Sequence, residues 1–142
     1  MVGANSRLDE LQAGLLNVRL GHMDEITEER KRLCANYTSR LHNPSIYLPK
    51  ERENTSTVWH QYVIRCDRRE ELIAYLNEKQ IGTIIHYPIP PHLSEAYQYL
   101  GHKKGEFPIT ENYAETVLSI PLYNGMTQQE QQYVIDAINA FQ

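Results

Sequence analysis

Cysteine is scarce in this chain of 142 residues, and its two cysteines form no recognisable motif. Cys34 and Cys66 lie in unrelated contexts, without the C-x-x-C spacing of a redox or zinc site. Long hydrophobic runs are also missing, since none approaches the roughly 20 apolar residues that a membrane-spanning helix needs. The first residues turn polar at once, unlike a secretory signal. These absences predict a cytoplasmic protein with reduced thiols and no membrane association.

A basic surface of one sign is missing as well. The chain has 14 Lys and Arg against 18 Asp and Glu, a net charge of −4 at pH 7. The richest charged run, residues 28–32, mixes acids and bases and indicates a solvated helix face. Because nucleic-acid binding needs clustered Lys and Arg to neutralise phosphates, we expect no nucleic-acid partner.

The usual hydrolase and metal motifs do not occur. The chain has neither a G-x-S-x-G nucleophile motif nor a glycine-rich phosphate loop. Its six histidines lack the compact spacing of a metal site, although His86 and His92 flank a proline-rich turn. Adjacent acids such as Asp24 and Glu25 fall on predicted helix faces, where solvation is their ordinary role. No metal site is therefore expected.

Hydrophobic periodicity predicts a long first helix over about residues 6–42, kinked at Gly21. Apolar residues recur at helical spacing from Leu8 to Leu41. Asn5 or Ser6 can cap its start, in a sequence that approximates a capping box. A helix of this length often runs along a second domain or a partner subunit.

Downstream of residue 45 the pattern alternates between strands and helices. Strands are predicted at 57–66 and 83–87, with a helix at 68–79 between them and an extended piece at 119–122. Further helices are expected over residues 93–100, 109–118 and 127–141. The chain therefore reads as one α+β domain over residues 1–142, with a small sheet backed by helices.

Two short segments could bind a ligand. His86 and Tyr87 end a predicted strand just before Pro88, so rigid backbone presents both side chains at the edge of the sheet. The alternative is a rigid turn whose side chains only pack. Near the N-terminus, Asn5 and Arg7 lie at a helix start that suits a phosphate. An ordinary helix cap is the alternative there.

Five motifs in order along the chain resemble the DegT/StrS family of sugar aminotransferases, which are fold-type-I pyridoxal-phosphate enzymes. They are GANSRLDELQA at 3–13, VWH at 58–60, IGT at 81–83, HYPIPPH at 86–92 and LSIPL at 118–122. The step Glu106-Phe107-Pro108 also falls where the family has a similar one. Each motif alone is of limited specificity, but five in order cover essentially the whole chain.

The resemblance implies that this chain is the C-terminal small domain of a longer enzyme. In the family, the N-terminal part supplies the aspartate for the cofactor's pyridine nitrogen and the Schiff-base lysine, and no lysine here matches that motif. The resemblance thus implies a split gene, a truncated gene or an expressed fragment, inactive alone. A stand-alone binding or interaction module, and a catalytically dead paralogue that serves regulation, are the alternatives.

The complete enzyme would transfer an amino group, from glutamate, to a nucleotide-linked keto-deoxysugar in cell-surface polysaccharide or glycoside biosynthesis. Family dimers build each active site from both subunits, so a homo-oligomer is expected. By resemblance, Asn5 and Arg7 would contact the phosphate of pyridoxal phosphate, and His86 and Tyr87 would contact the sugar nucleotide. The 86–92 motif looks most like members that aminate a 3-keto-6-deoxyhexose on thymidine diphosphate. The aminated carbon stays open.

Overall fold

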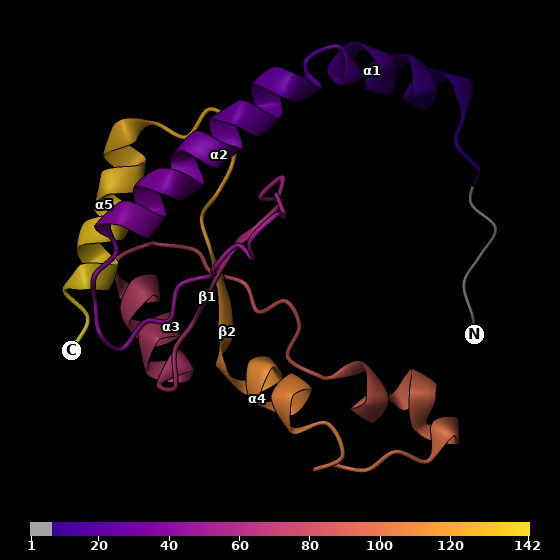
Figure 1. The fold of residues 1–142 in the computed structure, drawn as a ribbon, viewed down its shortest axis with the longest axis vertical. Coiled ribbons are helices and arrows are strands. Elements are labelled where there is room, and N and C mark those ends of the chain that lie inside the picture. Colours follow the sequence, from indigo (N-terminus) through magenta and orange to yellow (C-terminus); the bar gives the residue numbers. More distant parts are fainter. Residues whose placement is uncertain (1–6) are drawn as a thin grey trace.

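The computed structural model describes residues 7–142, beginning with two helices that meet at a break (Figure 1). Helix α1 spans Glu10–Leu20 and helix α2 spans Met23–Arg40. The turn between them confirms the kink predicted at Gly21. Asp9 caps α1, because its carboxylate accepts a hydrogen bond of 2.7 Å from the backbone N–H of Gln12. The caps expected from the sequence, Asn5 and Ser6, lie outside the described residues.

The sheet has two strands in the described part of the chain. Strand β1 (Tyr62–Arg65) pairs antiparallel with β2 (Val117–Ile120), with Tyr62 opposite Ile120. Single bridges extend it, one between Tyr47 and Arg65 and one between Ile84 and Ser119.

Both predicted strands were too long. The strand expected at 57–66 begins only at Tyr62, because Trp59 has a φ of 49° that breaks the extended backbone. The strand expected at 83–87 reduces to the bridge at Ile84. After Ile84 the chain turns away from the sheet towards Pro88. Of residues 83–87, only Ile84 therefore exchanges backbone hydrogen bonds with β2.

The remaining elements are helical. Helix α3 (Arg69–Glu78) follows β1, two short 3-10 helices η1 (Pro91–Leu93) and η2 (Glu95–Leu100) lie in the middle, and α4 (Pro108–Thr116) precedes β2. The last helix, α5 (Gln128–Asn139), begins with a capping box formed by Thr127 and Glu130. Helix α4 ends before the predicted residue 118, because the buried apolar run that follows forms β2. Periodicity does not separate a short buried strand from a helix.

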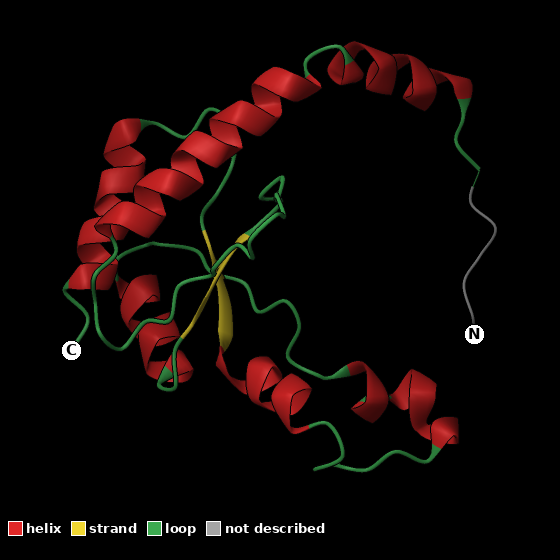
Figure 2. Ribbon diagram, viewed as in Figure 1, coloured by secondary structure: helices red, strands yellow, loops and turns green. Residues whose placement is uncertain are grey.

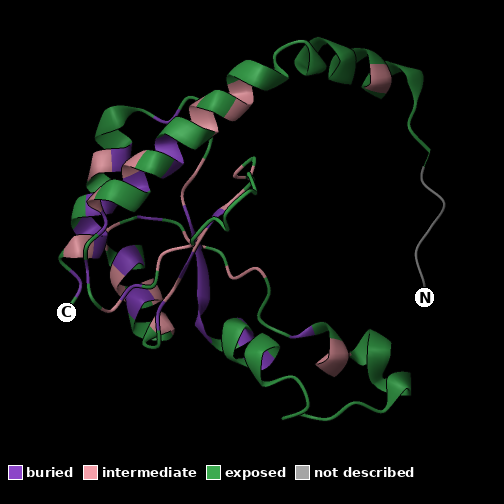
Figure 3. Ribbon diagram, in the orientation of Figure 1, coloured by how far each residue is buried: buried purple, intermediate pink, exposed green. Residues whose placement is uncertain are grey.

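The core lies between the sheet and helices α2, α3 and α5 (Figures 2 and 3). Tyr37 of α2 is fully buried, and its hydroxyl donates a hydrogen bond of 2.8 Å to the carbonyl oxygen of Pro121. The α+β fold predicted from the sequence is confirmed. The largest fully buried apolar side chains are Tyr37, Tyr62, Leu33, Ile64, Leu72, Leu76, Leu118, Ile135 and Ile138.

Helix α1 lies outside this core. None of its residues is buried, and Leu11 is 76% exposed. Figure 3 shows the whole helix extending away from the packed elements. Within the described residues, no helix combines the length and apolar character needed to cross a membrane. The exposed apolar side chains on and next to α1, called here the leucine face, are Leu8, Leu11, Leu15, Leu16, Val18 and Leu20.

We expect the purified chain to associate through the leucine face, because contiguous exposed apolar surface of this kind is rare on soluble monomers. Replacing Leu11 and Leu15 together by Gln should shift the chain towards its monomer mass of 16.6 kDa. Sedimentation velocity over a concentration series measures this. The matched control is Asn17→Ala, on the same exposed helix. A wild-type chain that stays monomeric at high concentration contradicts the prediction.

Candidate functional site

His86 is held at the end of the sheet by one residue from each strand region. Its ring nitrogen Nδ1 lies 3.0 Å from the amide nitrogen Nε2 of Gln61 and 2.9 Å from the hydroxyl oxygen of Ser119. Gln61 directly precedes β1, and Ser119 belongs to β2. The backbone of Ile84 pairs with that of Ser119, which sets the position from which the chain reaches His86. The imidazole is therefore positioned by the sheet.

Tyr87 projects from the same edge. Its ring meets that of His86 edge-on, with 5.4 Å between the ring centroids and 86° between the planes. Tyr87 is 74% exposed, whereas His86 is half-buried and lines a hollow of about 190 Å³ with Gln61, Ser119 and Leu122. The structure thus places the two predicted substrate-binding residues side by side. His86 is fixed by its hydrogen bonds, and Tyr87 is open to solvent. Their predicted contact with a sugar nucleotide stays a prediction.

Of the two predicted cofactor residues, only Arg7 is described, and it lies away from His86 and Tyr87. Arg7 precedes α1 and is exposed, and Asn5 lies outside the described residues. Because α1 contributes nothing to the core, the described chain does not bring Arg7 to His86 and Tyr87. That these residues share a site with a second subunit stays a prediction.

No lysine of this chain fits the role of a Schiff-base residue for pyridoxal phosphate. That role requires a desolvated amine with a lowered pKa. Instead, the hydrogen bond of 2.7 Å to Glu28 raises the pKa of Lys31. Lys79 is half-buried at the C-terminal end of α3, and its amine lies over the ring of Tyr75, 4.8 Å from the centroid. All five lysines are in the described residues, and the remaining exposed ones are Lys50, Lys103 and Lys104.

Arg30 forms a clamp that the sequence did not reveal. Its Nε donates a hydrogen bond of 2.9 Å to Asn124, and its Nη1 donates to the carbonyl oxygens of Trp59 and His60 at 3.1 and 3.0 Å. These bonds tie α2 to the segment that leads into Gln61.

The Arg30 clamp corrects the interpretation of residues 28–32 as a solvated face. Glu29 and Arg30 are half-buried, and Glu29 accepts hydrogen bonds from the Asn124 side chain and the Gly125 N–H, which lower its pKa. Arg30 lies three residues before the buried Leu33, on the inward side of α2. This spacing of three residues from Leu33 could have predicted from the sequence that Arg30 faces inward.

A second unforeseen cluster surrounds Glu111 of α4. Its carboxylate accepts hydrogen bonds from the Gly105 N–H at 2.8 Å and the Phe107 N–H at 3.3 Å, and lies 3.0 Å from Nε2 of His92. Burial raises the pKa of Glu111, but these hydrogen bonds outweigh burial and lower it. The cluster fastens the segment 91–107 to α4, which is a structural role.

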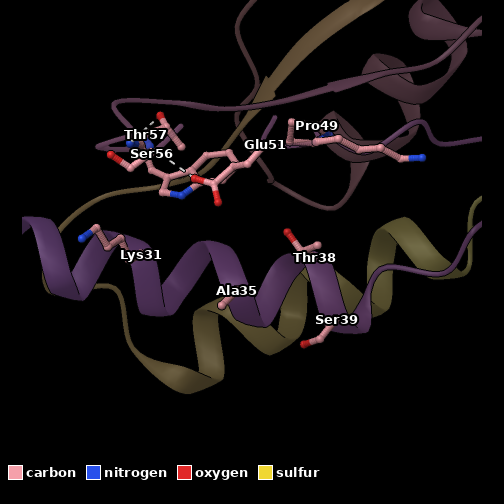
Figure 4. Close-up of a pocket in the computed structure, with 10 residues that line it drawn as sticks. Lys31, Ala35, Thr38, Ser39, Pro49, Glu51, Ser56 and Thr57 are labelled. Carbon is pink, nitrogen blue, oxygen red and sulfur yellow. Dashed lines mark hydrogen bonds between the residues drawn. The ribbon is translucent and has the colours of Figure 1, made fainter. Parts of the chain in front are cut away.

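A hollow of about 720 Å³, larger than the one at His86, is a groove between α2 and residues 49–59 (Figure 4). Lys31 and Thr38 face it from α2, and Pro49 and Thr57 from the opposite side. The Thr57 N–H donates to Glu51 at 3.3 Å. The groove is lined by none of the predicted site residues that the structure describes. It is therefore separate from the His86 hollow.

Residues 1–139 match the model of the DegT/DnrJ/EryC1/StrS aminotransferase family. A dTDP-3-amino-3,4,6-trideoxy-alpha-D-glucose transaminase of Streptomyces venezuelae is 42% identical over 137 residues, 96% of this chain and 36% of that protein. A dTDP-3-amino-3,6-dideoxy-alpha-D-galactopyranose transaminase of Aneurinibacillus thermoaerophilus is 40% identical, over 98% of this chain and 38% of its own length.

Two further relatives extend the comparison. The "pleiotropic regulatory protein" of Geobacillus stearothermophilus is 40% identical over 99% of this chain and 39% of that protein. The crystal structure of S. venezuelae DesV in complex with a ketimine intermediate superposes with a TM-score of 0.91 at 41% identity, covering 96% of this chain and 37% of DesV. The chain thus spans less than two fifths of each relative, within a fold-type-I aminotransferase architecture. It belongs to the DegT/DnrJ/EryC1/StrS aminotransferase family.

Proposed function

We propose that this chain is the C-terminal small domain of a sugar aminotransferase that transfers an amino group from glutamate to a nucleotide-linked keto-deoxysugar. The observation that carries the proposal is the pair His86 and Tyr87, held at a sheet edge in a chain 40–42% identical to two dTDP-sugar transaminases. The free thiols of Cys34 and Cys66 suit a cytoplasmic location for this reaction. Identity to the dTDP-sugar enzymes also favours a thymidine-diphosphate carrier.

Each site residue has a binding role in this proposal. His86 supplies a fixed imidazole and Tyr87 an exposed phenol for the oxygens of the sugar nucleotide. Asn5 and Arg7 contact the phosphate of pyridoxal phosphate in the neighbouring subunit of a homo-oligomer. Aminotransferases of the family depend on that cofactor, which supplies the electron sink for amino transfer. Because no lysine here fits, proton transfer belongs to the part of the family's length that this chain does not span.

The chain alone should form no stoichiometric Schiff base with pyridoxal phosphate and should show no transaminase activity. The reason is that Lys31, Lys50, Lys103 and Lys104 are exposed, and Lys79 is only half-buried at the end of α3. Visible spectra of the mixture, followed by borohydride reduction and peptide mass spectrometry, measure this. The control is lysine acetylated on its α-amine, used at the same total concentration of side-chain amine. Stoichiometric trapping at one lysine would refute the prediction.

A non-catalytic interaction module is the second candidate. It is favoured by the unpaired leucine face on α1 and by the similarity to a protein named as a pleiotropic regulatory protein. The two candidates differ in what the chain does when mixed with the cofactor-binding part of a family aminotransferase. Restored amino transfer supports the first, whereas binding to an intact enzyme that changes its activity supports the second.

A further inference from the structure

The two contacts at Nδ1 of His86 define where the proton of its ring lies. The nearer atom of Gln61 is its amide nitrogen, 3.0 Å away, and an amide NH₂ group donates hydrogen bonds but accepts none. Nδ1 must therefore accept this bond and carry no proton. In the neutral ring the proton then lies on Nε2.

Ser119 acts on the same nitrogen from the opposite strand. Its hydroxyl oxygen lies 2.9 Å from Nδ1, and it can only donate there because Nδ1 has no proton to give. Ser119 is 7% exposed, and its backbone N–H donates to the carbonyl oxygen of Ile84 at 2.8 Å. The hydroxyl is therefore shielded from water and fixed in place, as a hydrogen bond that selects one tautomer requires.

We infer that Gln61 and Ser119 are positioning residues that hold His86 in the Nε2–H tautomer. Nε2–H is then the ring's only donor for a ligand, so His86 recognises an acceptor oxygen. On the proposed function that oxygen belongs to the sugar nucleotide, whose phosphate oxygens are strong acceptors. The identity of the ligand rests on the proposed function, whereas the tautomer is a property of the unliganded chain.

The test is a long-range ¹H–¹⁵N correlation spectrum of the ¹⁵N-labelled 142-residue chain, which reports separately whether Nδ1 and Nε2 are protonated. The His86 signals are assigned by their loss in His86→Gln. We expect the Nε2–H form to exceed the Nδ1–H form by roughly tenfold or more, the ratio given by about 1.4 kcal/mol of hydrogen bonding. The exposed His60 in the same spectrum is the internal comparison and should show a smaller excess.

Two variants make the assignment specific. In Gln61→Glu a carboxylate replaces the donor, so Nδ1 should become protonated, by tautomer exchange or as the cation. In Ser119→Ala the Nε2–H form should remain but in smaller excess, since Gln61 still donates. Gln129→Glu, on the surface of α5, makes the same chemical change elsewhere and should leave His86 unaltered. Circular dichroism of each variant confirms that it is folded.

A wild-type His86 protonated on Nδ1, or no more biased than His60, would overturn the inference, even if Gln61→Glu does not fold. A folded Gln61→Glu variant whose His86 signals are unchanged would also overturn the inference. The proposed function fails separately: a fixed Nε2–H tautomer in an enzyme that does not use nucleotide-sugars would refute the function and leave the positioning role standing.

Discussion

Tyr87→Phe or His86→Ala should lower kcat/KM for the nucleotide-sugar about 10- to 150-fold in the enzyme that contains this domain. Loss of a hydrogen bond to a charged group costs roughly 1.5–3 kcal/mol, which converts to that range. Both side chains are presented by rigid backbone at the sheet edge, so their contacts require little ordering when the substrate binds. Their loss should therefore appear in productive use of the sugar rather than in stability.

The half of the reaction that uses glutamate should change far less, because glutamate carries no nucleotide. Asn5→Ala should behave differently, since a loosened cofactor slows both halves. Single-turnover measurements of each half, across the three variants, make the comparison. Tyr99→Phe is the matched control, because Tyr99 is 79% exposed on η2 and lies outside the proposed site. Equal losses in both halves for the His86 and Tyr87 variants would mean that the pair only supports the fold.

Arg30→Ala should destabilise the domain by about 2–4 kcal/mol, because it removes a guanidinium group that donates three hydrogen bonds. The carbonyl oxygens of Trp59 and His60 would lose a charged donor at a point where the backbone departs from extended geometry. Urea unfolding, followed by circular dichroism, gives the change in the free energy of unfolding.

Arg32→Ala is the control for this effect. It removes the same side chain two positions along α2, where the residue is exposed, and should change stability by less than about 0.5 kcal/mol. Equal midpoints for the two variants would show that the clamp contributes no net stability. A change in urea slope without a change in midpoint would instead indicate an altered unfolded state.

Local pattern located the helices of this domain well, apart from the end of α4, but misjudged the limits of its strands. The helical stripe, the break at Gly21 and the capping residue Thr127 all depend on neighbours a few positions away, so the sequence predicted them. The strands depend on partners elsewhere: Trp59 departs from extended geometry, and Ile84 finds one pairing position opposite Ser119. The strand propensity of the residues predicts neither the backbone angle of Trp59 nor the pairing position of Ile84.

The candidate site also has a part that the local sequence predicts and a part that depends on residues distant in the sequence. A strand followed by prolines was enough to single out His86 and Tyr87. The groups that hold His86 come from 25 and 33 residues away, and the partner of Arg30 on the 121–126 loop from 94 residues away. No short-range spacing reports such contacts. Order and identity of motifs, rather than periodicity, led to the family that the comparisons confirm.

The pairing of α2 with α5 has a consequence for synthesis on the ribosome. The carbonyl oxygen of Leu33 in α2 accepts a hydrogen bond from Gln131 in α5, and the hydrogen bonds that join these two helices span 92–99 residues. At about 5–20 residues per second, that interval lasts roughly 5–20 s. During it the nascent chain presents the apolar side of α2 without its partner, while long-range closure waits for the last helix. Chaperone binding to the emerging chain should therefore peak before α5 appears and fall once α5 has cleared the exit tunnel.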